Sequence, residues 1–198
     1  MTIIPNLYKN SMKLLLASQS PRRKELLSSL GFEFEVVKID CEEIIPENIK
    51  IEEAAAYLSD LKAQAFRDLE VGEVLLTADT VVAIDNEILG KPKDEEDAFK
   101  MLQHLSGRTH QVYTGITIKT ASTSITETDV ADVTLDNLSD EEINYYIQNY
   151  KPFDKAGSYG VQEWLGMAKI TSLTGSYYTI MGLPTHLVYK ILKESSLI

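Results

Sequence analysis

Three cations directly follow a helix-start signal near the N-terminus. Ser20 and Pro21 are typical of the N-cap and first position of a helix, and Arg22, Arg23 and Lys24 fill the turn that follows. Each cation there opposes the helix macrodipole, at a cost of about 0.3–1 kcal/mol. A bound polyphosphate would reverse that sign, because helix N–H groups and guanidinium groups both bind phosphate oxygens. The alternative, that these side chains extend into solvent or pair with acidic neighbours, fits the pattern equally well.

An aspartate interrupts the long apolar run from Val74 to Ile84. Asp79 lies near the middle of this β-rich segment, where a carboxylate needs a cation, a metal ion or several hydrogen-bond donors to offset its desolvation. Such a group could orient or deprotonate a water molecule, or hold a divalent ion that bridges phosphates. A structural ion pair or a turn between two strands explains the pattern about as well.

Three further signals are weaker when each is taken alone. Lys91 precedes a proline, which favours an extended backbone and a stiff loop that presents an ammonium group. Lys62 shares a helix row with apolar residues, and this spacing favours a side chain that snorkels from the core edge over one that enters a cleft. The glycine-bearing stretch Asp154–Gln162 could bring Lys155 and the Gln162 amide close to a ligand, including a base edge.

Composition restricts the classes of partner. The 198-residue chain is 44% hydrophobic and 25% charged, with a net charge of −11, so it is an ordinary globular sequence and a poor match for nucleic acids or anionic membranes. A small anionic substrate is not excluded, because exposed charges are screened beyond about 8 Å. No apolar run approaches the roughly 20 residues of a membrane helix. The single cysteine fits a reducing compartment, and we expect a cytoplasmic protein.

Several familiar catalytic motifs are absent from the sequence. It contains no GxxxxGK[ST] phosphate loop, no GxGxxG, no HExxH and no GxSxG. Its three histidines are far apart and no CxxC pair occurs, which disfavours a zinc enzyme. Phosphate chemistry would therefore require a different scaffold.

Alternating elements must position these residues. Hydrophobic periodicity and capping signals predict helices over 21–30, 52–69, 94–106, 139–150 and 184–194, and strands over 13–17, 32–39, 73–84, 87–89, 112–120, 124–135 and 177–181. Residues 40–50 form an acidic loop in this interpretation. The pattern predicts an α/β fold with a mixed sheet.

Seven motifs, in this order, resemble the Maf family of nucleoside triphosphate pyrophosphatases. They are LASQSPRRKELL (Leu16–Leu27), LKAQA (Leu61–Ala65), TADTVV (Thr77–Val82), LGKP (Leu89–Pro92), LSGRTHQVYTG (Leu105–Gly115), DKAGSYGVQ (Asp154–Gln162) and GLP (Gly182–Pro184). Together they span nearly the whole chain from Met12.

The resemblance implies an elongated α/β fold with a mixed sheet, similar to that of inosine triphosphatases, with two lobes around a central cleft. It implies a single catalytic domain over residues 12–198 after an N-terminal extension of residues 1–11, and a homodimer. The implied reaction is attack of water on the α-phosphate of a nucleoside triphosphate, with a divalent cation (Mg²⁺ or Mn²⁺) as cofactor.

The resemblance also implies roles for individual residues. Asp79 corresponds to the general base, and Arg22, Thr80 and Gln162 match positions linked to substrate choice. Polar and cationic positions that line the cleft correspond to Ser18, Arg23, Lys62, Lys91 and Lys155. The family's Asp-Glu pair appears here as Glu42-Glu43, so Glu43 is the candidate carboxylate that holds metal or water together with Asp79.

The late loop indicates a branch of the family. DKAGSYG with Gln162 resembles the branch that acts on dTTP and UTP, although Glu163-Trp164 stands where many relatives have glycine after the glutamine. The alternatives are a Maf-type enzyme for 7-methyl-GTP or modified pyrimidine nucleotides, an inosine triphosphatase, and a nucleotide-sensing regulator of cell division.

Overall fold

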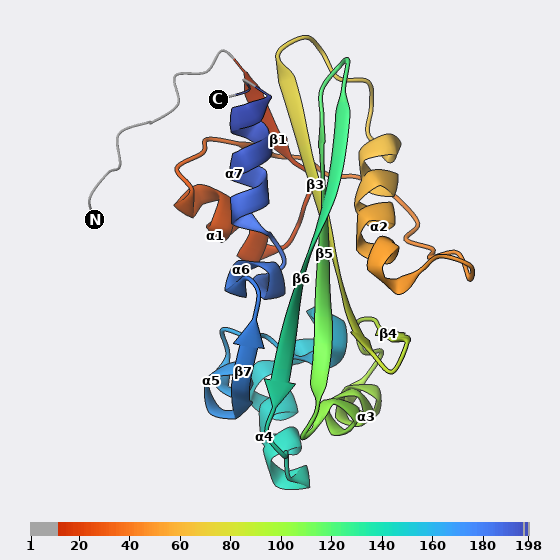
Figure 1. Ribbon diagram of the computed structural model, residues 1–198, viewed down its shortest axis with the longest axis vertical. Helices are drawn as coiled ribbons and strands as arrows, with labels where there is room; N and C mark the ends of the chain where they lie inside the picture. Colours follow the sequence, from red (N-terminus) through yellow and green to blue (C-terminus); the bar gives the residue numbers. More distant parts are fainter. Residues whose placement is uncertain (1–11, 196, 198) are drawn as a thin grey trace. The chain divides into compact units, whose positions relative to one another are not determined.

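The computed structural model describes residues 12–195 and residue 197. The expected extension over residues 1–11 lies outside this range. The elements, in chain order, are β1 (Lys13–Leu16), α1 (Pro21–Ser29), β2 (Glu35–Val36), α2 (Ile51–Ala65), β3 (Glu73–Ile84), β4 (Glu87–Leu89), α3 (Glu95–Leu105), β5 (Thr109–Lys119), β6 (Ser124–Leu135), α4 (Asp140–Tyr150), the 3₁₀ helices η1 (Pro152–Asp154) and η2 (Ala156–Ser158), α5 (Trp164–Lys169), β7 (Ile170–Thr174), α6 (Tyr177–Met181) and α7 (Thr185–Glu194) (Figure 1).

The strands form a mixed sheet, as the sequence predicts. Within the described part of the chain the sheet has seven strands in the order β2-β1-β3-β5-β6-β7, with β4 paired to β3. The β1–β2 and β1–β3 pairs are parallel, whereas β3–β4 and β6–β7 are antiparallel. The β3–β4 hairpin turns at Asp85 and Asn86, both with positive φ, as a tight hairpin turn requires.

The chain folds into two compact units. Unit 1 takes in the residues up to Asp79, Thr114–Asp129 and the residues from Gly182 onward, whereas unit 2 takes in Thr80–Tyr113 and Val130–Met181. Each of the strands β3, β5 and β6 therefore passes from one unit to the other partway along its length.

Among the described residues, no helix has both the length and the apolar character needed to cross a membrane.

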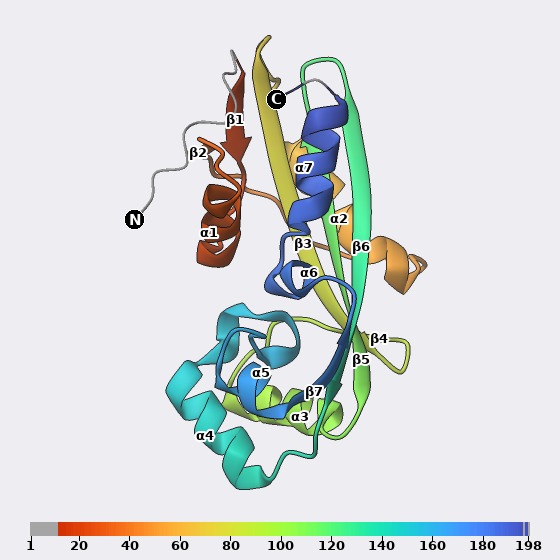
Figure 2. The same cartoon turned by 60° about the vertical axis from the view of Figure 1, so that its left-hand side comes forward.

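In unit 1, helices cover both faces of the strands. Helix α2 lies on one side of them and helices α1 and α7 lie on the other (Figures 1 and 2). One part of its core is built from Leu15, Ala17, Ala63, Leu69 and Leu75, with Val37, Ile39 and Phe66 packed against it. This core joins β1, β3 and α2, the elements that carry or flank the cations and the aspartate singled out by the sequence.

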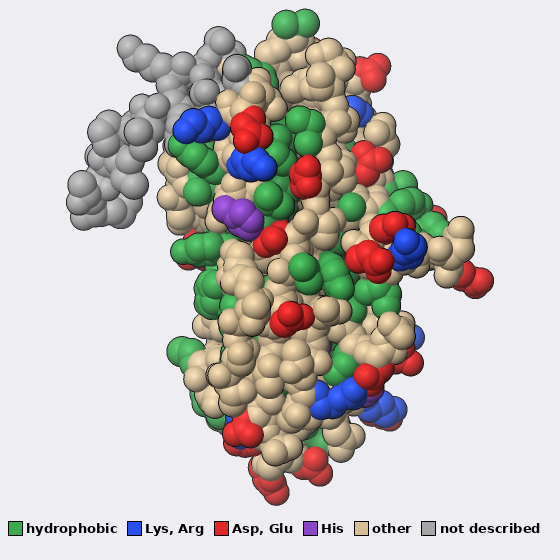
Figure 3. Space-filling view, in the orientation of Figure 1, with side chains coloured by type: hydrophobic (Ala, Val, Ile, Leu, Met, Phe, Trp, Pro, Cys, Tyr) green, Lys and Arg blue, Asp and Glu red, His purple; other side chains and the backbone are tan. Residues whose placement is uncertain are grey.

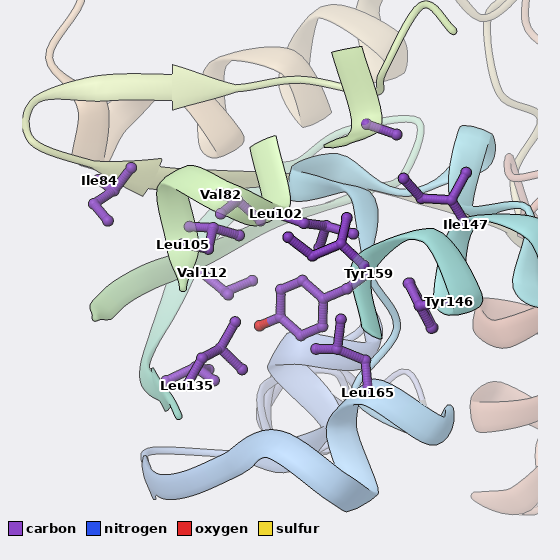
Figure 4. Close-up of a cluster of buried hydrophobic side chains, with 13 residues drawn as sticks. Val82, Ile84, Leu102, Leu105, Val112, Leu135, Tyr146, Ile147, Tyr159 and Leu165 are labelled. Atoms are coloured by element: carbon purple, nitrogen blue, oxygen red, sulfur yellow. The ribbon is translucent and has the colours of Figure 1, made fainter. Parts of the chain in front are cut away.

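In unit 2, helices α3 and α4 pack together and close a second core. Its buried side chains surround the ring of Tyr159 (Figure 4). The Tyr159 hydroxyl forms a 2.7 Å hydrogen bond with Nε2 of His110, and both side chains are buried. Burial lowers the pKa of His110 to about 4 and raises the pKa of Tyr159 well above its usual range.

The buried His110 makes stability depend on pH. Its pKa lies near 4 in the fold and near 6.5 in the unfolded chain, so the unfolded chain takes up the proton first as the pH falls. We expect this residue to lower the free energy of unfolding by about 2 kcal/mol between pH 7 and pH 5. Urea unfolding of the wild type and of His110→Gln at both pH values tests this, because the variant should lack that part of the slope. Equal slopes in the two proteins would contradict it.

Most predicted elements are confirmed, and three differ. The strand expected over residues 32–39 is reduced to Glu35–Val36, and the helix expected over residues 52–69 ends at Ala65, because Phe66 is already extended. The strand expected over residues 177–181 is wrong, since Tyr177–Met181 is the short helix α6.

The physical reason for the last error is the shortness of the segment. Its aromatic and β-branched residues are typical of a strand, and it buries the alternate positions Thr179 and Met181. A run of five mostly apolar residues does not distinguish helix from strand by periodicity. Glycines with positive φ, Gly175 and Gly182, flank it and allow the backbone to turn sharply on both sides.

Candidate active site

The carboxylate of Asp79 is paired with a lysine side chain. Nζ of Lys62, on α2, donates a hydrogen bond to Oδ2 of Asp79, on β3. The same Nζ lies 3.0 Å from Oε1 of Glu43, in the acidic loop after β2. Lys62 and Asp79 are mostly buried, with side-chain exposures of 15% and 12%, whereas Glu43 is 43% exposed. Lys62 therefore does not snorkel into solvent as its spacing suggested, but links the two candidate carboxylates.

Helix α2 is held against the sheet by a close backbone approach. A Cβ atom built on Gly115, in β5, would lie 2.3 Å from the carbonyl carbon and oxygen of Ala55. No real side chain tolerates such a distance from backbone atoms, so glycine is required there for helix and strand to meet. Lys119, further along β5, donates a 3.1 Å hydrogen bond from Nζ to the carbonyl oxygen of Ala63 near the end of the helix.

Buried hydroxyl groups fix the same helix one turn before Lys62. The Ser59 hydroxyl forms a 2.6 Å hydrogen bond with the hydroxyl of Thr117, and the Thr77 hydroxyl donates a 2.7 Å bond to the Ser59 carbonyl oxygen. Thr77 and Asp79 lie two residues apart on β3, so their side chains point to the same face of the strand. These contacts therefore set the position from which Lys62 reaches Asp79.

The start of α1 brings a partly buried arginine towards the same charges. The Ser20 hydroxyl caps the helix by accepting a 3.4 Å bond from the backbone N–H of Arg23, and Nε of Arg23 donates a 2.7 Å bond to the carbonyl oxygen of Gly182. Burial lowers the pKa of the Arg23 guanidinium, whereas the charges of Asp79 and Glu43 oppose that shift. Arg23, Lys62, Asp79 and Glu43 thus form one electrostatic group within unit 1.

Two more of the predicted residues belong to the start of α1. Ser18 is buried, and its hydroxyl accepts a 3.2 Å bond from the backbone N–H of Ser20. The charge of Arg22 also acts on Arg23 and, together with burial, lowers the pKa of the Arg23 guanidinium. On the face of the described chain shown in Figure 3, acidic and basic side chains are interspersed rather than gathered by sign.

In unit 2, the LGKP and DKAGSYG motifs lie side by side. The Gly157 N–H donates a 3.1 Å hydrogen bond to the carbonyl oxygen of Gly90, next to the exposed Lys91. Gly157 has φ +66°, and a Cβ atom there would lie 3.0 Å from the Val82 side chain. Glycine is thus needed for the late loop to turn tightly against β3.

Lys155 is almost fully buried and is paired with carboxylates. Its Nζ lies 2.7 Å from Oδ1 of Asp154 and 3.1 Å from Oε1 of Glu163. Glu163 also accepts a hydrogen bond from the hydroxyl of Tyr146, on α4. In the sequence, Glu163 stands out only as a departure from the family pattern. Its position beside Gln162 was the only signal of a role in the loop.

The remaining specificity candidates are Thr80 and Gln162. Thr80 directly follows Asp79 on β3, so the two side chains point to opposite faces of the strand. Oε1 of Gln162 is buried and accepts no hydrogen bond from any residue that the structure describes. A buried amide oxygen without a donor costs about 1–3 kcal/mol, and a ligand N–H group would satisfy it.

Comparison with known proteins assigns the family. The family described as Maf-like protein matches residues 13–195. The chain belongs to the Maf family. Its similarity to members named dTTP/UTP pyrophosphatase is high: 52% identity to the protein of Flavobacterium psychrophilum (89% of this chain, 91% of the relative), 48% to that of Phocaeicola vulgatus (92% and 95%) and 50% to that of Porphyromonas gingivalis strain W83 (92% and 94%).

Similarity to solved structures is weaker. A HAM1 protein from Coxiella burnetii matches 63% of this chain and 73% of its own, with 14% identity and a TM-score of 0.42, which is too low to bear on the site.

The Maf motifs themselves map onto both units. SPRR, LKAQA and the aspartate of TADTVV lie in unit 1, whereas LGKP and DKAGSYGVQ lie in unit 2.

Proposed function

We propose that this Maf protein hydrolyses dTTP and UTP to the nucleoside monophosphate and pyrophosphate. The observation that carries the proposal is the group of Asp79, Lys62 and Arg23, a mostly buried carboxylate set among cations. An ammonium in contact with Asp79 offsets the cost of burying that charge. The names of the relatives, which are about 50% identical over most of the chain, support the choice of substrate.

In the proposed reaction Asp79 acts as the general base. Its carboxylate accepts a proton from a water molecule, and the water oxygen forms a bond to the α-phosphorus. The bond between the α-phosphorus and the oxygen that bridges to the β-phosphorus breaks, and pyrophosphate leaves with that oxygen. Lys62 and Arg23 stabilise the negative charge on the phosphate oxygens. Within unit 1, the start of α1, with Ser18 and Arg22, is proposed to bind further phosphate oxygens. The exposed Lys91 is the proposed phosphate-binding cation of unit 2.

Glu43 and Asp79 have the chemistry to hold a divalent cation. Carboxylate oxygens are the ligands that Mg²⁺ and Mn²⁺ prefer, and Lys62 already draws these two side chains towards one point. Among residues 12–195 and 197, no cluster of three or more His, Cys, Asp or Glu side chains is placed to hold a metal. The substrate's phosphates would thus complete the ligand set, as is usual for Mg²⁺. The bound cation would supply charge neutralisation and polarisation of the phosphoryl group.

Gln162 is proposed to recognise the base. Arg22 and Thr80 are each proposed to influence the choice of substrate. Thymine and uracil carry an N–H donor at N3 beside carbonyl acceptors, so an amide can both accept from and donate to that edge. The buried Oε1 of Gln162, which lacks a donor among the described residues, suits the N3–H group. Lys155 is proposed to support this loop through its carboxylate partners.

We also propose that residues 12–198 act as a single catalytic domain, in a cytoplasmic homodimer that binds neither nucleic acid nor membrane. The net charge of −11 supports the last part, because it repels polyanions and anionic lipid surfaces.

The test is a panel of triphosphates with Mg²⁺ and with Mn²⁺, in which pyrophosphate and orthophosphate release are measured separately. We expect pyrophosphate from dTTP and UTP at rates at least about tenfold above those for dCTP, dATP and dGTP, and no turnover in excess EDTA. Preference for 7-methyl-GTP or inosine triphosphate would contradict the proposed specificity. Binding of nucleotides without any turnover would favour the nucleotide-sensing alternative.

A further inference from the structure

The carboxylate of Glu163 is held at both of its oxygens within unit 2. Oε1 lies 3.1 Å from Nζ of Lys155, and Oε2 accepts a hydrogen bond from the Tyr146 hydroxyl. That hydroxyl in turn accepts a 2.9 Å bond from the backbone N–H of Gly160. Tyr146 is fully buried and stacks on Tyr150, so its hydroxyl is a fixed point. Glu163 therefore has a defined position relative to the loop that carries Gln162.

The Gln162 amide and the Glu163 carboxylate both lie beside Gly160. A Cβ atom built on Gly160 would lie 3.1 Å from Nε2 of Gln162 and 3.1 Å from Oε2 of Glu163. A side chain at position 160 would displace one or both of these groups. A backbone hydrogen bond of 3.0 Å from the Glu163 N–H to the Gly160 carbonyl oxygen closes the turn that brings them together.

The carboxylate of Glu163 acts differently on the nitrogen and on the oxygen of the Gln162 amide. A carboxylate attracts the amide N–H groups and repels the amide oxygen, so the nitrogen of Gln162 is favoured on the side of Glu163. Oε1 is then left to face a donor from elsewhere, which agrees with its burial without a partner among the described residues. A negative charge on Glu163 would thus favour one of the two orientations of the amide.

The orientation of the amide determines which base it recognises, because a freely rotating glutamine can pair with either thymine/uracil or cytosine. In one orientation its oxygen accepts from N3–H and its nitrogen donates to O4 of thymine or uracil. Turned by half a rotation, the same amide accepts from the exocyclic amine of cytosine and donates to its unprotonated N3. A glutamine alone therefore discriminates poorly between these pyrimidines.

We propose that Glu163, held by Tyr146 and Lys155, is a positioning residue that locks the Gln162 amide in the orientation that reads thymine and uracil and rejects cytosine. This inference rests on the proposed pyrimidine triphosphatase function and extends it to the basis of discrimination. Glu163 acts through Gln162 and does not itself contact the base.

The test compares Glu163→Gln and Tyr146→Phe with the wild type on dTTP and dCTP. We expect the ratio of kcat/KM for dTTP to that for dCTP to fall about tenfold in Glu163→Gln and about threefold in Tyr146→Phe. Part of the fall should be a gain on dCTP, because the released amide can now turn. The kcat for dTTP should change less than about twofold, since the effect is on base binding.

The matched control is Tyr145→Phe. It removes a hydroxyl from the adjacent, half-exposed residue of α4 and keeps the ring that packs against Trp164. This variant should retain the wild-type preference.

The outcomes separate this inference from the proposed function. A preference for dTTP over dCTP that persists in both Glu163→Gln and Tyr146→Phe, or equal losses on the two nucleotides, would overturn the positioning role alone. A wild type without that preference would overturn the proposed specificity as well. A gain on dCTP supports the positioning role, because a purely structural defect would lower both activities.

Discussion

Asp79→Asn is expected to lower kcat for pyrophosphate release from dTTP by about 10²–10⁴-fold, the range that a general base typically contributes. The amide has nearly the same shape as the carboxylate, and it cannot accept the proton of the attacking water at neutral pH. The KM should change less than kcat, because Lys62 and Arg23 remain to bind the phosphates. Steady-state kinetics at saturating dTTP and Mg²⁺ measure the effect.

A second aspartate serves as the control for this substitution. Asp60 lies on α2 two residues before Lys62, and its carboxylate accepts a 3.3 Å bond from Gln64 on the helix surface. Asp60→Asn should retain activity within about twofold, since surface substitutions are usually near neutral. Activity of Asp79→Asn within about threefold of the wild type would remove Asp79 from the chemistry and favour a purely structural ion pair.

Gly115→Ala is expected to destabilise the fold strongly. Its methyl group would lie 2.3 Å from the backbone of Ala55, which must move because no flexible side chain is there to yield. We expect a loss of about 3 kcal/mol in the free energy of unfolding and a fall in Tm of about 6–12 °C. The same shift would move α2 and thus Lys62 away from Asp79, so the remaining folded protein should have a lower kcat.

The matched control is Gly90→Ala. Gly90 has no positive φ, and a Cβ atom built there meets nothing within 4 Å. Its substitution should change the Tm by no more than about 2 °C. Equal stability of the two variants, measured by thermal and urea unfolding, would show that α2 does not require the close approach at Gly115.

The sequence predicted elements best where a local signal determines them. The capping box of Ser139 and Glu142 starts α4 as expected, and β3 has the predicted limits Glu73 and Ile84. The prediction for residues 177–181 was wrong because five residues show too little periodicity to distinguish helix from strand. Glycines with positive φ, Gly175 and Gly182, flank this segment.

The candidate site was less predictable, because its contacts join distant parts of the chain. The spacing of Lys62 in the sequence is typical of a lysine at the edge of the core. In the fold, however, Lys62 contacts both Asp79 and Glu43. The bond from Arg23 to the Gly182 carbonyl oxygen spans 159 positions in the sequence. No local sequence pattern predicts a contact between residues so far apart. Only the family motifs indicated that these residues act together. The role of Glu163 depends likewise on Tyr146, which sequence reasoning treated only as part of a helix.

In the proposed reaction, water attacks the α-phosphorus rather than the β- or γ-phosphorus. Hydrolysis of dTTP in ¹⁸O-labelled water, followed by ³¹P NMR or mass spectrometry of the products, tests it most directly. We expect dTMP and pyrophosphate in equal amounts, with one labelled oxygen in dTMP and none in pyrophosphate. Label in pyrophosphate would place the attack on the β-phosphorus, and formation of dTDP with orthophosphate would place it on the γ-phosphorus. Either result would contradict the proposed reaction.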